Sequence, residues 1–159
     1  MIQASKQKLA EIWQYLNRIA FPVWTTPVAL LVVCFFAFGL FAPSQGFYGD
    51  EWEMVYHATL QHAQGLANFF FYDEHPSIAW NYILSFNFLG INTFAWHLYS
   101  LLWRWMSVAT FWLAINQVWP TRRLETLMAA IFFALHPIFY LQAQAVAYYE
   151  VWVSYTILW

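Results

Sequence analysis

The feature that most constrains this chain is an uncharged apolar run from residue 21 to residue 42. It is as long as the roughly 20 apolar residues that an α-helix needs to cross a bilayer. The whole sequence is poor in charge: 9% of its residues are charged and 62% are hydrophobic, whereas an average soluble domain is about 25% charged. Six Lys and Arg with eight Asp and Glu cannot cover a soluble globule of 159 residues. The sequence therefore predicts an all-α, polytopic integral membrane protein.

Composition and motifs also narrow the classes of ligand. The net charge of -2 gives no basic field for nucleic acid, and the sequence has neither a G-x-x-x-x-G-K-[ST] loop nor a G-x-G-x-x-G loop for nucleotides. The one cysteine, Cys34, lies inside the apolar run, so no intramolecular disulfide or cysteine pair can form. We therefore expect no nucleic-acid partner and no certain cofactor, and a divalent metal is a candidate only if the protein is an enzyme.

Residues 1–20 are expected to form a cytoplasmic amphipathic helix in the membrane interface. They carry three of the six basic residues, Lys6, Lys8 and Arg18, and their apolar residues recur at helical spacing. Because Lys and Arg stay on the cytoplasmic side of a membrane, the N-terminus is placed inside and the 21–42 helix ends outside. The expected location is the cell (plasma) membrane, with several spans.

Residues 43–92 are predicted to form an external acidic loop that contains two interfacial helices. The loop holds five of the eight acidic residues and neither Lys nor Arg. Residues 51–66 have the pattern of an amphipathic helix with Asp50 as its N-cap and Glu53 completing a capping box. Residues 76–90 are mostly apolar, but at about 1.5 Å per residue they reach only about 20 Å, less than the roughly 30 Å of a bilayer core. This second segment is therefore expected to lie along the outer interface.

Two further spans are predicted after the loop. Residues 93–119 are long enough to cross inward, and they end before Arg122 and Arg123, which belong on the inner side. Residues 124–141 then return outward, and residues 151–159 begin a fourth span. Because this last run is too short to cross, we expect the protein to continue beyond it. The alternative in which the second interfacial helix crosses the membrane stays open, although it would place both arginines outside.

Short motifs occur in a recognisable order along this topology. In chain order they are Gly49-Asp50-Glu51, Asp73-Glu74-His75-Pro76, Phe94-Ala95-Trp96-His97-Leu98, Arg122-Arg123-Leu124 and His136-Pro137. From residue 21 to residue 159, this order resembles the N-terminal module of the C-type superfamily of membrane glycosyltransferases, in particular the protein O-mannosyltransferase and lipid A aminoarabinose transferase branch. The chain departs from the family pattern at Ser77, where the family has a second proline.

The resemblance implies both a reaction and the residues that carry it. Asp50 would supply the catalytic carboxylate, with Glu51 beside it. The positions implied in substrate binding are Asp73, Glu74, His75 and Glu150. The donor would be a polyprenyl-phosphate sugar whose tail stays in the bilayer, so that a carboxylate at the outer interface can deprotonate the acceptor hydroxyl while the phosphate leaves.

The same acidic residues also have ordinary structural interpretations. Asp50 can serve only as a helix N-cap, a role worth about 1 kcal/mol. Asp73 can be a turn residue before Pro76, and Glu150 can be a solvated residue at the membrane edge. The sequence leaves these alternatives open.

Other polar residues carry separate predictions. Arg104 lies near the middle of a predicted span, where an unpaired charge costs roughly 2.5–3.5 kcal/mol or more, so we expect it to face protein or a partner subunit. His97 and His136 are weak candidates for haem ligation, because both lie near the outer ends of antiparallel helices. Backbone carbonyls are the commoner partners of such single histidines. Glu53 and His57 share a helical face, but a complete set of zinc ligands is lacking.

Two functions from different classes follow. The first is a membrane module of a polyprenyl-phosphate-sugar-dependent glycosyltransferase that acts at the outer face, and that would not be catalytic as this chain alone. The alternative is a non-catalytic accessory transmembrane subunit of a larger complex, for example a respiratory or photosynthetic electron-transfer assembly. The expected partners are membrane lipid, a polyprenyl-phosphate sugar, and other membrane subunits or a C-terminal part of the same protein.

Overall fold

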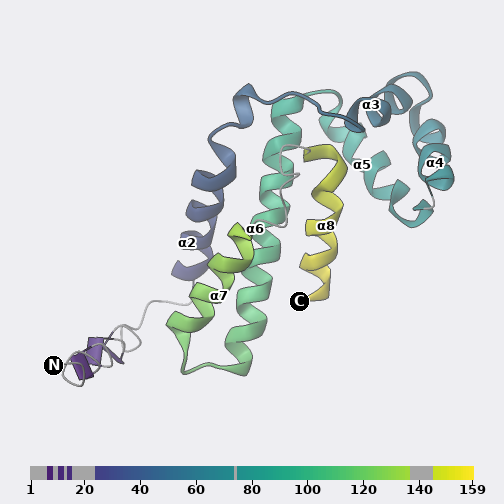
Figure 1. Cartoon of the computed structure of the whole chain (residues 1–159). Helices are drawn as coiled ribbons and strands as arrows, with labels where there is room; N and C mark the ends of the chain where they lie inside the picture. Colours follow the sequence, from purple (N-terminus) through teal and green to yellow (C-terminus); the bar gives the residue numbers. More distant parts are fainter. Residues whose placement is uncertain (1–6, 9–10, 13, 16–23, 74, 137–144) are drawn as a thin grey trace.

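The computed structural model describes residues 7–8, 11–12, 14–15, 24–73, 75–136 and 145–159. Within these residues the chain is helical and contains no β-strand, which confirms the predicted all-α class. Four helices lie side by side as a bundle: α2 (Thr25–Cys34), α6 (Thr93–Val118), α7 (Arg123–Leu135) and α8 (Ala145–Leu158). Three further helices form a cap beside one end of the bundle (Figure 1): α3 (Glu51–Leu60), α4 (His62–Tyr72) and α5 (Ala79–Leu89).

The first apolar segment forms one long helix with an irregular end. α2 continues through a π-helical turn, Phe35–Gly39, and a 3-10 turn, Ala42–Ser44. The whole stretch Thr25–Ser44 has 20 residues and a mean hydropathy of 2.2, and it is the one helix among the described residues that is long and apolar enough to cross a membrane. The structure thus supports membrane association through this helix, and the further spans remain predictions.

Gly39 lets this helix approach α6 closely. A Cβ added at Gly39 would lie 2.8 Å from the Phe35 ring and 3.0 Å from the Leu101 side chain. Because real side chains do not pack at such distances, glycine at this position permits the contact between the π-helical turn and α6.

The cap begins with a helical hairpin, whereas the sequence predicted one helix over residues 51–66. The break falls at His62, whose φ of +54° lies in the left-handed region. Gly65 permits the close return of the chain, because a Cβ there would lie 2.3 Å from the Gln61 Cβ and 2.8 Å from the His57 carbonyl oxygen. A helical period alone does not reveal such a break, and the prediction of a single helix was wrong.

The predicted helices over residues 76–90 and 93–119 are present as α5 and α6. A 3-10 turn at Pro76–Ile78 leads into α5, which ends at Gly90 with a φ of +56°. The Asn92 side chain accepts a hydrogen bond of 3.1 Å from the Ala95 N–H and so caps α6.

The last two helices have different limits from those predicted. α7 ends at Leu135 rather than near residue 141. The proline at position 137 disfavours helical backbone at the residue before it, His136. Residues 137–144 lie outside the described residues. α8 begins at Ala145, six residues before the predicted start of the fourth span at residue 151.

Two separate clusters of buried side chains hold these helices together. The bundle cluster joins α2, α6 and α7 through Leu30, Cys34, Val108, Trp112, Ala130 and Ala134. The cap cluster joins the cap to α6 and α8 through Phe47, Met54, Val55, Leu66, Phe70, Ala79, Tyr82, Phe86, Trp96, Val146, Tyr149 and Val153. α8 therefore links the cap to the bundle.

Arg104 lies inside the bundle and faces protein, as expected for a charge in the middle of a long apolar helix. Only 5% of its surface is exposed. Its guanidinium carbon lies 3.8 Å from the centre of the Phe38 ring and 4.3 Å from that of Trp152. These cation–π contacts connect α6 with the π-helical turn and with α8.

Candidate functional site

The two adjacent carboxylates Asp50 and Glu51 point to different surroundings. Glu51 is fully buried, and its carboxylate accepts hydrogen bonds from the backbone N–H of Tyr48 (2.8 Å), of Ala147 (3.2 Å) and of Val146. The last two belong to the first turn of α8, whose unpaired N–H groups favour a negative charge. Glu51 therefore connects the start of the cap to the start of α8.

Burial and hydrogen bonding act in opposite directions on this carboxyl group. Burial raises the pKa of Glu51 above its ordinary value, and the three backbone N–H donors partly offset that rise. Glu51 therefore has the geometry of a structural carboxyl group, and although it is next to Asp50 in the sequence, it is not accessible to substrate.

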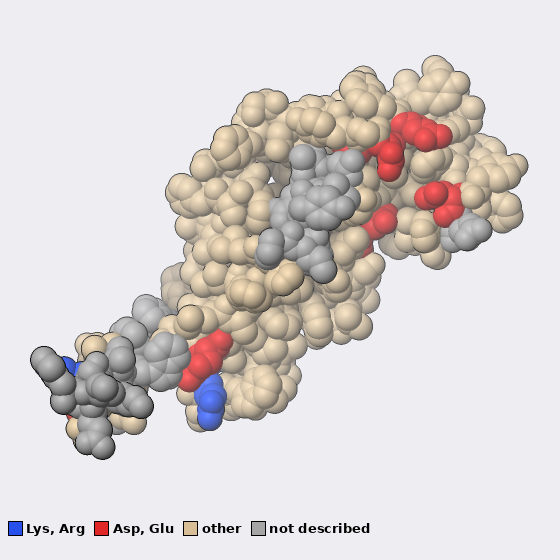
Figure 2. Space-filling model, in the orientation of Figure 1, with Lys and Arg blue, Asp and Glu red and all other residues tan. Residues whose placement is uncertain are grey.

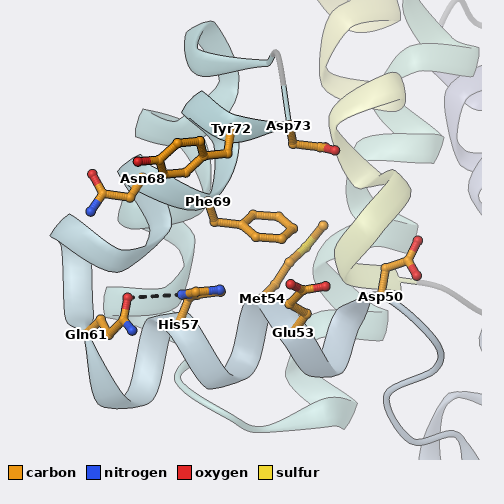
Figure 3. Close-up of a pocket in the computed structure, with 9 residues that line it drawn as sticks. All are labelled: Asp50, Glu53, Met54, His57, Gln61, Asn68, Phe69, Tyr72 and Asp73. Carbon is orange, nitrogen blue, oxygen red and sulfur yellow. Dashed lines mark hydrogen bonds between the residues drawn. The ribbon is translucent and has the colours of Figure 1, made fainter.

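Asp50, in contrast, is exposed, and its side chain makes no capping hydrogen bond to α3. The predicted capping box with Glu53 is therefore absent, and both side chains line a cavity of about 530 Å³ instead. Figure 3 shows this acidic cavity, whose lining residues are Asp50, Glu53, Met54, His57, Gln61, Asn68, Phe69, Tyr72 and Asp73.

The α3–α4 hairpin explains why distant acidic residues meet at this cavity. Asp50 immediately precedes α3, and Asp73 immediately follows α4. Because α4 folds back along α3, the two carboxylates lie at the same open end of the hairpin (Figure 3). The break at His62, which the sequence did not predict, is what brings the two predicted acidic positions together.

The opposite end of the cavity is built from an imidazole, two side-chain amides and aromatic rings. His57 Nδ1 and Gln61 Oε1 are 3.1 Å apart, and the His57 and Phe69 ring centres are 5.3 Å apart. Asn68 and Tyr72 complete this side. The cavity thus offers carboxylate and amide oxygens as hydrogen-bond acceptors beside aromatic surface, a set suited to a hydroxyl-rich molecule.

Acidic residues dominate this end of the molecule. On the face shown in Figure 2, acidic side chains gather over the cap and no basic side chain is visible there, whereas basic side chains lie at the opposite end. None of the described residues that line the acidic cavity is Lys or Arg. The cavity therefore disfavours an anionic ligand unless other groups neutralise it.

The remaining predicted substrate positions lie beside this cavity. Glu150 on α8 is within electrostatic range of Asp73 and His75, and one of its carboxylate oxygens, Oε2, is buried with no hydrogen-bond partner among the described residues. His75 is exposed. Glu74 lies outside the described residues.

A network of hydroxyl groups that the sequence did not predict lies between the cap and α8. Tyr82 donates a hydrogen bond of 3.0 Å to the Ala147 carbonyl, and Ser85 lies 3.0 Å from the Tyr149 hydroxyl and 3.4 Å from that of Tyr99. Burial is the main cause of the raised pKa of Tyr82, and the nearby Glu150 charge adds to it. The sequence signal was Ser85, a polar residue that lies three positions after Tyr82 on the same buried face of the mostly apolar α5.

The structure also shows the surroundings of the candidate haem ligands, His97 and His136. His97 Nε2 lies 3.3 Å from the Gly46 carbonyl oxygen, the kind of backbone partner expected for a single histidine, and the His136 ring lies 5.5 Å from that of Phe132. Among the described residues, no group of three or more His, Cys, Asp or Glu side chains could hold a metal ion. These contacts lend no support to a haem or zinc site.

Comparisons with models of protein families, with curated proteins and with solved structures find no match to this chain.

Proposed function

We propose that this chain forms the N-terminal membrane module of a glycosyltransferase that takes sugar from a polyprenyl-phosphate donor at the outer membrane face. The observation that carries the proposal is the position of Asp50. It is exposed in a cavity that also contains Asp73, whereas its neighbour Glu51 is buried in backbone contacts. Asp50 is the carboxylate that a substrate can reach, and it is also the one that the family resemblance implies.

In the proposed reaction Asp50 acts as the general base. Its carboxylate accepts the proton of the acceptor hydroxyl as that oxygen attacks the anomeric carbon of the donor. The bond from the anomeric carbon to the phosphate oxygen breaks, and its electron pair leaves with the polyprenyl phosphate. A positioned base of this kind contributes about 10²- to 10⁴-fold in rate.

The membrane placement in this proposal puts the acidic cavity at a suitable depth. The helix Thr25–Ser44 crosses the bilayer, and a short connection leads from its outer end to Asp50. α6 and α7 are proposed to cross as well, and residues 151–159 are proposed to begin a fourth span, with the cap on the outer surface. The donor's lipid tail can then stay in the bilayer while its sugar reaches the cavity.

The other acidic positions are proposed to orient substrate. Asp73 shares the cavity with Asp50, and Glu150 is close enough to both Asp73 and His75 to be affected by their charges. His75 is the candidate hydrogen-bond donor to the leaving phosphate. Glu51 is proposed to position α8 and not to contact substrate.

The direct test is glycosyl transfer by the full-length protein in proteoliposomes that contain a polyprenyl-phosphate sugar and a hydroxyl acceptor. Asp50→Asn is expected to lower kcat about 10²- to 10⁴-fold. Glu53→Gln is the matched control, because Glu53 lines the same cavity one turn further along α3. Undiminished transfer by Asp50→Asn, or an equal loss in the control, would exclude Asp50 as the base.

One observation favours the second candidate, an accessory subunit of a larger membrane complex. No Lys or Arg occurs among the described residues that line the acidic cavity, so little positive charge is present to stabilise a leaving phosphate. Purification of the full-length protein in mild detergent distinguishes the two. Stoichiometric co-purification of other subunits without transfer activity would support the accessory role.

A further inference from the structure

We propose that a second cavity, between the end of α6 and the start of α7, binds the headgroup of phosphatidylethanolamine from the inner leaflet. In the orientation proposed above, this end of the bundle faces the cytoplasm. The inference rests on that orientation and not on glycosyl transfer.

The cavity has the size of a small-ligand site. Its volume is about 530 Å³, within the roughly 300–1,000 Å³ that is usual for ligand sites. The α6 side is lined by Phe111, Ile115 and Trp119, and the other side by Arg122 and Glu125. It lies at the opposite end of the molecule from the acidic cavity.

Polar and apolar groups are arranged along this cavity as they are along a phospholipid. Arg122 lies in the turn that joins the two helices and Glu125 in the first turn of α7, whereas Ile115 and Phe111 lie on successive turns of α6 toward the middle of the bundle. From Val118 to Phe111 the helix rises about 10 Å. A headgroup at the turn would therefore place the beginning of an acyl chain against Ile115 and Phe111. Trp119 is half exposed at the same level, where indole rings favour the membrane interface.

The two charged residues select the class of headgroup. The Arg122 guanidinium presents several N–H donors that fit a phosphate group. The Glu125 carboxylate provides acceptors for the N–H groups of a primary ammonium. Phosphatidylethanolamine carries both a phosphate and a primary ammonium. Phosphatidylcholine has no N–H to donate, and phosphatidylglycerol has no cation for Glu125.

The chain provides one residue to control for the charged contact and another to test the space in the cavity. Arg123 is adjacent to Arg122 but does not line the cavity, so it separates a specific contact from the general attraction of basic residues to phosphate. Ala129 lines the cavity and is exposed, so Ala129→Trp fills the space without changing the charge.

The test is native mass spectrometry of the purified full-length protein in detergent, with phosphatidylethanolamine, phosphatidylcholine and phosphatidylglycerol added singly and in pairs. We expect the protein to retain phosphatidylethanolamine roughly tenfold better than phosphatidylcholine, as one charge-assisted hydrogen bond allows. Glu125→Gln should bring the two lipids close to parity. Arg122→Gln and Ala129→Trp should lower retention of every phospholipid, whereas Arg123→Gln should behave as the unmodified protein does.

Equal retention of the three lipids by the unmodified protein would overturn the proposal, as would a preference for phosphatidylglycerol. Unchanged retention in Ala129→Trp, with helicity intact by circular dichroism, would show that lipid binds elsewhere and would also overturn it. Glycosyl transfer is a separate readout on the same samples. Its absence counts against the proposed function alone, and loss of lipid preference with intact transfer counts against this inference alone.

Discussion

The bundle cluster and the cap cluster are built from different kinds of side chain. The bundle cluster contains Cys34, Ala130 and Ala134, small residues that let helix backbones approach closely, as helices in membranes often do. Half of the residues in the cap cluster are aromatic, and this region encloses polar groups, among them Glu51 and the hydroxyl of Tyr149. The comparison teaches that close packing of apolar side chains fills the bundle cluster, whereas the attachment of the cap to α8 also uses hydrogen bonds inside its cluster.

The largest effect is expected from removing Glu51. Glu51→Ala leaves the N–H groups of Val146 and Ala147 without their carboxylate, which should lower the free energy of unfolding by roughly 3 kcal/mol. The change should appear as faster proteolysis of the cap in detergent-solubilised protein. Glu53→Ala, an exposed change on the same helix, should stay within about 0.5 kcal/mol. Equal effects of the two substitutions would contradict the structural role of Glu51.

Overpacking the bundle should produce the next largest effect. Ala130 is fully buried between α7 and its neighbours, so Ala130→Leu should lower the free energy of unfolding by about 2 kcal/mol. Thermal unfolding followed by circular dichroism measures this change, and Met128→Leu on the exposed face is the control. If the bundle and the cap respond to separate contacts, protection of the cap from protease should be retained in Ala130→Leu below its transition temperature.

A smaller effect is expected from the hydroxyl network. Ser85→Ala removes one partner of the Tyr149 hydroxyl inside the cap cluster and should cost about 1 kcal/mol. Combining Ser85→Ala with Tyr149→Phe should cost less than the sum of the single changes, because the double variant leaves neither hydroxyl buried alone. Strict additivity in a double-mutant cycle would show that the two groups do not interact.

The smallest expected effect is the pH dependence that Glu51 confers on the attachment of the cap. Burial raises the pKa of this carboxyl in the folded protein above its ordinary value of 4.5, so the folded state binds the proton more readily than the unfolded state. The free energy of unfolding should therefore fall as the pH rises from below 4.5 through the folded-state pKa. Unfolding curves at a series of pH values, compared with those of Glu51→Gln, measure this contribution. A stability that instead increases with pH through Glu51 would mean that its hydrogen bonds outweigh its burial.

The helices were predictable from the sequence where an apolar run is bounded by a capping residue or a proline. The helix limits near Asn92 and Pro120 follow from such local signals, as does the end of the first apolar run near Pro43. The break at His62 was not predictable in this way, because the helical period continues through it and only tertiary packing holds its positive φ. The start of α8 was missed for a related reason, since the carboxylate that its first turn contacts belongs to Glu51.

The residues of the candidate site were likewise predictable only in part. The family resemblance singled out Asp50, Asp73 and Glu150, and in the structure the first two share a cavity while Glu150 lies within electrostatic range of Asp73. Gln61 and Asn68 were missed, because nothing in a helical pattern shows that an exposed amide will face a cavity rather than bulk solvent. The two amides line the cavity only because α4 folds back along α3.

The contact between Glu51 and α8 also has a consequence for the order of events during synthesis. Glu51 and Val146 are 95 residues apart, and the carboxylate leaves the ribosome first. At translation rates of about 5–20 residues per second, it precedes its amide partners by roughly 5–20 s. During that interval the nascent cap lacks its attachment to α8, so a helix that is synthesised later completes the packing of the cap.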